Sequence, residues 1–119
     1  MVGTIRGDAI QVGTTLQFDN ATATTTTTTQ TAIASFSATT FGGAKIVVEA
    51  KDGSNRHITE LLVTHDGTTA SATEYATIFT SASLATYDVD INAGNVRLLA
   101  TAASTNSTNF KVALSLMKA

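Results

Sequence analysis

The stretch that decides the fold is AKIVVEAKDGSNRHITELLVTHDG, residues 44–67. Its first half alternates apolar and polar side chains and stops at Asp52-Gly53, a dipeptide that tolerates the positive φ angles of a tight hairpin. Its second half, from His57 to His65, alternates in the same way and stops at Asp66-Gly67. Period-two alternation between two such turn signals predicts a hairpin in which residues 44–51 lie antiparallel to residues 56–64.

The rest of the compact region repeats this pattern at short intervals. Alternating runs at residues 72–80, 87–91, 96–100 and 110–117 are separated by polar turns. Threonine makes up about a fifth of the chain and proline is absent, and β-branched and aromatic residues favour strands over helices. We therefore predict an all-β fold, an antiparallel β-sandwich or jelly-roll-like single domain with an extended N-terminal arm, and place Tyr75, Phe79 and Tyr87 in its core.

The first 29 residues differ from this pattern. Six consecutive threonines, Thr24 to Thr29, form a low-complexity segment, and the residues before them are glycine-rich with sparse apolar positions. We divide the chain into an N-terminal arm and Thr-rich linker, residues 1–29, and a sandwich domain, residues 30–119, which we expect to fold without the arm. An arm of this kind holds a neighbouring subunit through its spaced apolar side chains, here Ile5, Ile10, Val12, Leu16 and Phe18. The alternative, that the arm forms the first two strands of the sandwich, stays open.

Composition removes several classes of protein. Charged residues are 13% of the 119 and the net charge is -2, which favours neither a nucleic-acid-binding protein nor a disordered chain. Cysteine is absent, so disulfides and thiolate metal sites are excluded. No run approaches the roughly 18 apolar residues that span a bilayer, and we expect neither a membrane segment nor a leader.

Few residues stand in patterns that carry chemistry. Asp88, Asp90 and Asn92 resemble part of a calcium loop, but the glycine comes one position late and Leu99 stands where a bidentate Glu is needed. His57 and His65 share a strand face about 26 Å apart at a rise of roughly 3.3 Å per residue, too far to hold one cation. With no nucleophile elbow and no paired acids either, we predict no enzyme activity, no catalytic residues, no metal and no cofactor.

The segment from Thr31 to Leu116 resembles a domain of virion structural proteins from tailed phages, particularly phages of marine bacteria and cyanobacteria. The motifs that carry the resemblance, taken in this order, are Ile33–Phe36, Ala44-Lys45 with Val47-Val48, Leu62–Ala70 around the His-Asp-Gly-Thr-Thr turn, Thr73–Tyr75, and Asp90–Leu99 with its Asn-Ala-Gly-Asn-Val-Arg-Leu run. The resemblance implies a β-sandwich that assembles into a phage particle and brings no catalytic residues with it. The arm lies outside it.

The resemblance leads to a functional expectation. We expect a capsid decoration or cement protein that is located in the virion and binds the head shell through subunit surfaces and its arm. The expected partners are other copies of the chain, as a homotrimer, and virion proteins such as the major capsid protein, but neither nucleic acid nor membrane. The alternative is a tail-fibre or spike protein whose polar loops, residues 67–71 and 104–109, bind the host. A secreted sugar-binding module or small enzyme is the least favoured class.

Overall fold

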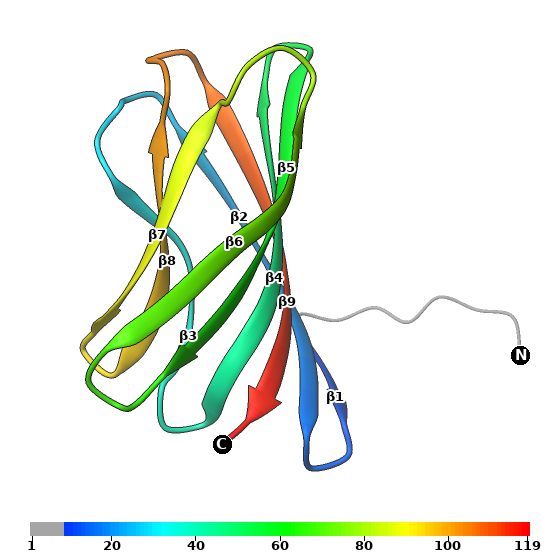
Figure 1. Ribbon diagram of the computed structural model, residues 1–119, viewed down its shortest axis with the longest axis vertical. Helices are drawn as coiled ribbons and strands as arrows, with labels where there is room; N and C mark the ends of the chain where they lie inside the picture. The colour runs from blue at the N-terminus through cyan, green and yellow to red at the C-terminus, as the bar shows by residue number, and fades with distance from the viewer. Residues whose placement is uncertain (1–8) are drawn as a thin grey trace, which may run out of the picture.

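The computed structural model describes residues 9–119. All regular secondary structure in this range is β-strand (Figure 1). Among these residues there is no helix long and apolar enough to cross a membrane. The predicted interface residue Ile5 lies outside the described residues. In chain order the strands are β1 (Ala9–Val12), β2 (Leu16–Thr25), β3 (Thr31–Ser37), β4 (Phe41–Asp52), β5 (Asn55–His65), β6 (Ala70–Phe79), β7 (Ala85–Asn92), β8 (Asn95–Ala102) and β9 (Thr108–Lys118).

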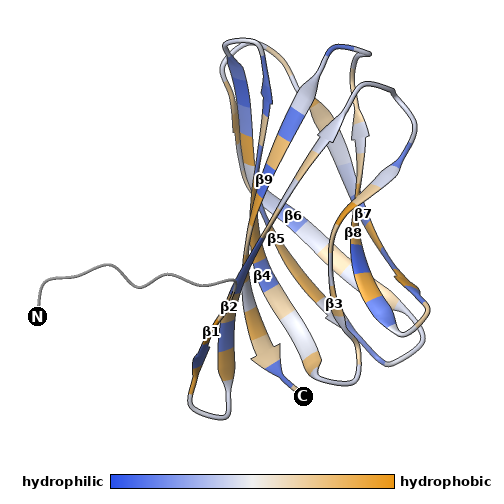
Figure 2. Ribbon diagram, turned by 180° about the vertical axis from the view of Figure 1, so that it is seen from behind, coloured by the Kyte–Doolittle hydropathy of each residue, from blue (hydrophilic) through white to orange (hydrophobic). Residues whose placement is uncertain are grey.

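Two antiparallel sheets make up the described part of the chain. The larger has six strands in the order β1-β2-β9-β4-β5-β6, and the smaller has three in the order β3-β8-β7. The alternation read from the sequence is visible as successive bands of opposite hydropathy along the strands (Figure 2). The apolar side chains that face the space between the sheets form a single core, which includes Phe36, Ile46, Val48, Val96, Leu98, Phe110 and Leu116. The predicted all-β sandwich is confirmed.

The hairpin that was expected from residues 44–67 is present. β4 and β5 pair antiparallel from Gly43 opposite Thr64 to Asp52 opposite Asn55. Gly53 has φ +61° and Gly67 has φ +95°, the left-handed values that a tight turn requires and that glycine adopts without steric cost. The pattern therefore located both turns and fixed which side chains of β4 enter the core.

The division at residue 29 is wrong for residues 9–25, the β-strand part of the predicted arm that the structure describes. β2 pairs with β9 along its whole length, from Leu16 opposite Met117 to Thr25 opposite Thr108. On its inner face Ala21 and Ala23 pack against the core and Thr25 is buried. Because these inward-facing side chains are small or polar, β2 shows no apolar run in the sequence. For this reason the sequence predicted a linker here. β1 and β2 are the first two strands of the sandwich.

β6 corrects a second expectation. Tyr75 and Phe79, predicted as core residues, are 37% and 46% exposed because β6 is the last strand of its sheet. A bulge opposite β5, where Ala76 has φ +54°, interrupts the alternation. Tyr75 consequently lies opposite Glu60 on the outer face, whereas Phe79 contacts the ring of His57 on the inner side. Tyr87 does pack against the core, as predicted.

Candidate functional site

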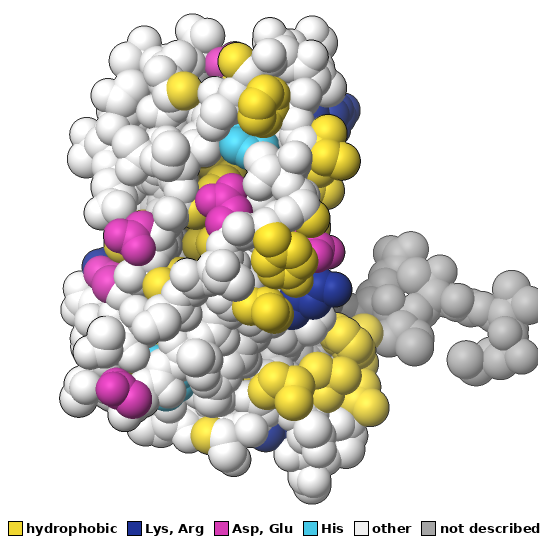
Figure 3. Space-filling view, viewed as in Figure 1, with side chains coloured by type: hydrophobic (Ala, Val, Ile, Leu, Met, Phe, Trp, Pro, Cys, Tyr) yellow, Lys and Arg dark blue, Asp and Glu magenta, His cyan; other side chains and the backbone are white. Residues whose placement is uncertain are grey.

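Four of the five predicted interface residues gather on one side of the β1–β2 hairpin. Ile10 pairs with Phe18 and Val12 with Leu16, and Leu16 pairs in turn with Met117 on β9. Residues opposite one another in antiparallel strands project from the same face of the sheet. This face points away from the core, and Ile10, Val12, Phe18 and Met117 are 39% to 50% exposed. We call Ile10, Val12, Leu16, Phe18 and Met117 the edge cluster; Figure 3 shows exposed apolar side chains gathered over this end of the molecule.

A second apolar surface lies near the opposite edge of the same sheet. Ile58 and Leu62 of β5 and Tyr75 and Ile78 of β6 are all exposed, Ile78 by 68%. Ile58 lies opposite Ile78, so their side chains meet on the outer face. We call these four residues the β5–β6 patch. The six-stranded sheet therefore presents an apolar surface at each of its two edges.

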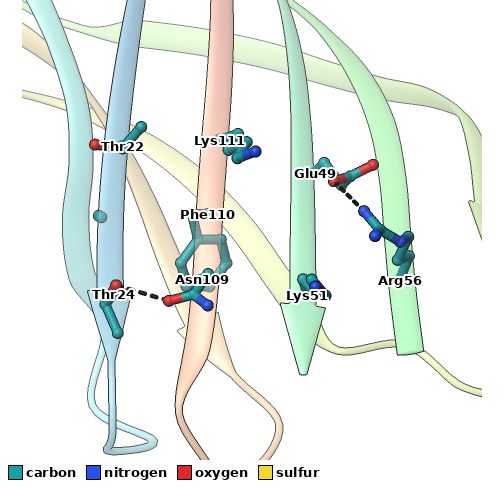
Figure 4. A pocket seen from close by; sticks show the side chains of 9 residues that line it. Thr22, Thr24, Glu49, Lys51, Arg56, Asn109, Phe110 and Lys111 are labelled. Carbon is teal, nitrogen blue, oxygen red and sulfur yellow. Dashed lines mark hydrogen bonds and ion pairs between the residues drawn. The ribbon is translucent and has the colours of Figure 1, made fainter. Parts of the chain in front are cut away.

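Between these surfaces, the outer face is hollowed and carries positive charge. A groove of about 340 Å³ crosses β2, β9, β4 and β5 and is lined by Thr22, Thr24, Glu49, Lys51, Arg56, Asn109 and Lys111 (Figure 4). The strand register aligns these side chains, because Thr22, Lys111 and Glu49 form one row and Thr24, Asn109, Lys51 and Arg56 the next. Three of the chain's seven basic residues thus meet a single carboxylate.

Two contacts order this groove. Arg56 Nη1 donates to Glu49 Oε1 at 3.1 Å, in an ion pair that is open to solvent. Thr24 Oγ1 donates to Asn109 Oδ1 at 2.8 Å, which leaves the amide nitrogen of Asn109 as a donor. Lys51 and Lys111 form no ion pair with any described residue. The groove can therefore offer two ammonium groups, a guanidinium and several hydroxyl or amide groups to a ligand.

The two histidines are both engaged in the fold. His57 is buried, its Nδ1 accepts a hydrogen bond from the Leu84 amide at 3.1 Å, and its ring packs against Phe79 and Tyr87. His65 Nδ1 accepts from the Gly67 amide, so its Nε2 donates to the Phe41 carbonyl at 2.7 Å. Burial lowers the pKa of His57, with the charge of Glu74 opposing this shift. Each histidine therefore forms hydrogen bonds that hold a neighbouring loop or strand in place.

The burial of His57 predicts a pH-dependent stability. Its folded pKa lies below the ordinary value of about 6.5, so the unfolded chain binds the proton more tightly. Stability is consequently full above about pH 6.5 and falls as the pH drops towards the folded pKa, because a protonated Nδ1 can no longer accept from Leu84. We expect the melting temperature to decrease from pH 7.5 to pH 5.5. In His57→Gln this decrease should be smaller; an equal decrease would place its origin elsewhere.

The aspartates that resembled a calcium loop form other contacts. Both oxygens of Asp90 accept from Arg97, at 2.8 and 2.6 Å, and this hydrogen-bonded pairing lowers the pKa of Asp90. Asp88 Oδ1 accepts from the Val89 amide. Within residues 9–119 no three His, Asp or Glu side chains are close enough to hold a metal ion. Asp88 and Asp90 thus form hydrogen bonds within or next to β7 rather than a metal site.

Sequence reasoning missed the residues of the groove. Lys51 and Lys111 were placed on polar strand faces, and Asn109 at the end of a polar loop, but no local pattern joins them. They meet because β9 inserts between β2 and β4. The one available signal was the position of three of the few basic residues. Lys51, Arg56 and Lys111 alternate with the inward-facing residues of their strands and therefore belong to the outer face.

The chain was compared with protein families, curated proteins and solved structures. No protein family and no curated protein matches the chain. Among solved structures, the tailspike protein of Acinetobacter phage vB_ApiP_P1 is similar, with 22% sequence identity and a TM-score of 0.56. The likeness covers 86% of this chain and 22% of the tailspike chain. It establishes a shared sandwich fold with one part of a larger protein.

Proposed function

We propose that the protein is a structural component of a phage virion and forms a β-sandwich module of the tail-spike or tail-fibre type. The observation that carries this is the likeness of fold, over most of the chain, to one segment of a phage tailspike. The module is not an enzyme in this proposal. Support comes from His57 Nδ1, both ring nitrogens of His65 and both carboxylate oxygens of Asp90, which are engaged in hydrogen bonds of the fold itself.

A capsid decoration protein is the second candidate. It is favoured by the exposed apolar side chains at both edges of the larger sheet, through which a single sandwich can bind a shell of other subunits. The two candidates differ in where the protein sits and in how many copies a particle holds.

Localisation on purified virions separates these candidates. Gold-labelled antibody against the protein should bind the tail, and quantitative mass spectrometry should find about as many copies as there are spike or fibre subunits. Labelling over the whole head together with hundreds of copies would instead establish the decoration role. Absence of the protein from virions would refute both.

The exposed apolar surfaces support assembly with further copies of the chain. In this proposal the edge cluster of one copy packs against the β5–β6 patch of the next. Contacts between two different surfaces close either as a two-fold pair or as a ring of three or more copies. The assembly proposed here is the trimeric ring. The interface residues are then Ile10, Val12, Leu16 and Phe18, joined by Met117. In the decoration candidate the ring also contacts other virion proteins, such as the major capsid protein.

A charge introduced into the edge cluster tests this assembly. We expect light scattering at micromolar concentration to give three times the 12.3 kDa chain mass for the native protein. Phe18→Asp should dissociate it, because burying one such side chain contributes about 1.5 to 3 kcal/mol, a ten- to hundredfold change in association. The control is Thr86→Asp, which places a charge at an exposed position of the smaller sheet and should leave the mass unchanged. A native mass of 12.3 kDa would refute the proposed interface.

A further inference from the structure

The segment between β6 and β7 carries the chain from the larger sheet to the smaller one, at the top of Figure 1. We call residues 80–84 the β6–β7 connection. Its backbone donates hydrogen bonds to β5 at both ends, from Thr80 to the Arg56 carbonyl at 3.0 Å and from Leu84 to His57 Nδ1 at 3.1 Å. The second of these bonds has a titratable acceptor. The protonation state of His57 therefore decides how firmly the connection is held.

The end of β6 that leads into this connection is weakly attached. Ala76, in the bulge, has φ +54°. Beyond the bulge β6 keeps two residue pairs with β5, Ile58 with Ile78 and His57 with Phe79, and within the described residues no strand lies on its other side. Segments with few buried contacts and exposed backbone hydrogen bonds are the ones that open locally. This end of β6 and the connection can thus separate from β5 while the core stays folded.

Protonation of His57 conflicts with the closed arrangement. Because Nδ1 accepts from Leu84, the neutral ring carries its hydrogen on Nε2, and a further proton would place an N–H on Nδ1 against the N–H of Leu84. His57 is 1% exposed, and its Nε2 has no hydrogen-bond partner among the described residues. A charged ring would therefore be buried with neither of its hydrogens bonded, whereas water solvates it once the connection opens.

The surrounding groups leave His57 as the side chain that responds to mild acid. Burial lowers its pKa, and the Glu74 carboxylate of β6 opposes this shift. From β7 the ring meets Tyr87, whose burial raises its pKa, so the hydroxyl stays neutral. β4 and β9 contribute Ala50 and Phe110 to the same row, and the connection holds no titratable side chain. The open form therefore binds a proton more tightly than the closed form.

We propose that His57 is a pH-sensitive switch between the two sheets. In its neutral form it holds the β6–β7 connection against β5, and in its protonated form it releases the connection. Release also displaces Ile78, the most exposed member of the β5–β6 patch, so acid weakens the contact between copies of the chain. This last consequence rests on the proposed function, whereas the switch itself is a property of the single chain.

Amide hydrogen exchange, followed by NMR on the full-length protein, tests the switch. After correction for the intrinsic exchange rate, the protection factors of Thr80 and Leu84 should fall about three- to tenfold between pH 7.5 and pH 5.5. The upper value follows because pH 5.5 lies one unit below the ordinary histidine pKa of 6.5. At both pH values these factors should lie at least tenfold below those of Val48 and Leu114 in the core, since the connection opens alone.

Three variants assign the response to one side chain. His57→Gln keeps an acceptor for Leu84 but cannot be protonated in this range, so its protection factors at the connection should not change with pH. The matched control is His65→Gln, which removes the other histidine, bonded to the Phe41 carbonyl, and should respond as the native protein does. Glu74→Gln should also keep the response, because in the proposal the carboxylate is not the group that titrates.

Three results would overturn the switch. These are protection at Leu84 equal to that of the core, an unchanged response in His57→Gln, and loss of the response in His65→Gln or Glu74→Gln. The native protein and the last two variants decide the matter even if His57→Gln does not fold.

Light scattering at the same two pH values tests the link to assembly separately. We expect the trimer mass at pH 7.5 and a lower mass at pH 5.5. A trimer that persists at pH 5.5 would refute the link. A single-chain mass at both pH values would refute the proposed assembly, and hydrogen exchange would still decide whether the switch exists.

Discussion

Removing residues 1–29 should abolish cooperative folding, whereas removing residues 1–14 should leave it intact. The longer deletion takes away β2, which pairs with β9 over ten residues and covers the core with Ala21, Ala23 and the buried Thr25. It also exposes the backbone of β9, the strand that carries Phe110, Val112, Leu114 and Leu116. A new edge of this length is a site for aggregation.

The shorter deletion is the matched control. It removes β1, whose four residues are all exposed and pair only with β2. Circular dichroism and thermal melts should show a native-like transition for the shorter deletion and a broad or absent transition for the longer one. If the chain lacking residues 1–29 melted as cooperatively as the full chain, β2 would be an accessory strand and the division originally drawn at residue 29 would stand.

Phe110→Ala should lower the free energy of unfolding by about 3 to 5 kcal/mol, the usual cost of truncating a buried aromatic side chain. Phe110 is 1% exposed and lies on β9, inside the larger sheet. Its ring meets that of Tyr87 on β7 edge-to-face, with 6.3 Å between centroids, so it joins the two layers of the sandwich. Single domains are stable by only about 5 to 15 kcal/mol, and this one change removes a large part of that.

Urea denaturation measures the Phe110 effect. Phe18→Ala provides the comparison, because Phe18 is 43% exposed and its truncation should cost far less in the dissociated chain. Phe110→Leu should fall between the two, since leucine refills part of the cavity. A loss below about 1 kcal/mol in Phe110→Ala would mean that the layers are not closely packed around this ring.

The sequence by itself determined β4, β5 and β9 and their inner faces. In β4, Ala44, Ile46, Val48 and Ala50 share one face, and three of the four residues on the other face are charged, so the four apolar side chains face inward. Asp52-Gly53 closes the hairpin onto β5. Both signals are local, because side-chain direction repeats every two residues and a tight turn is specified by its own residues. The same rule gave the inward side chains of β9.

Only the tertiary structure decided which strands lie in the middle of a sheet and which at its edge. Tyr75 and Phe79 alternate as core residues do, yet β6 has no strand beyond it and a bulge turns the two rings to opposite faces. Ala21 and Ala23 looked like linker residues and became part of the core surface once β2 lay beside β9. Lys51 and Lys111 line the same groove because β4 and β9, which are far apart in the sequence, are neighbours in the sheet. Which strands pair depends on how the apolar faces of all the strands are buried together. No single segment of the sequence contains that information.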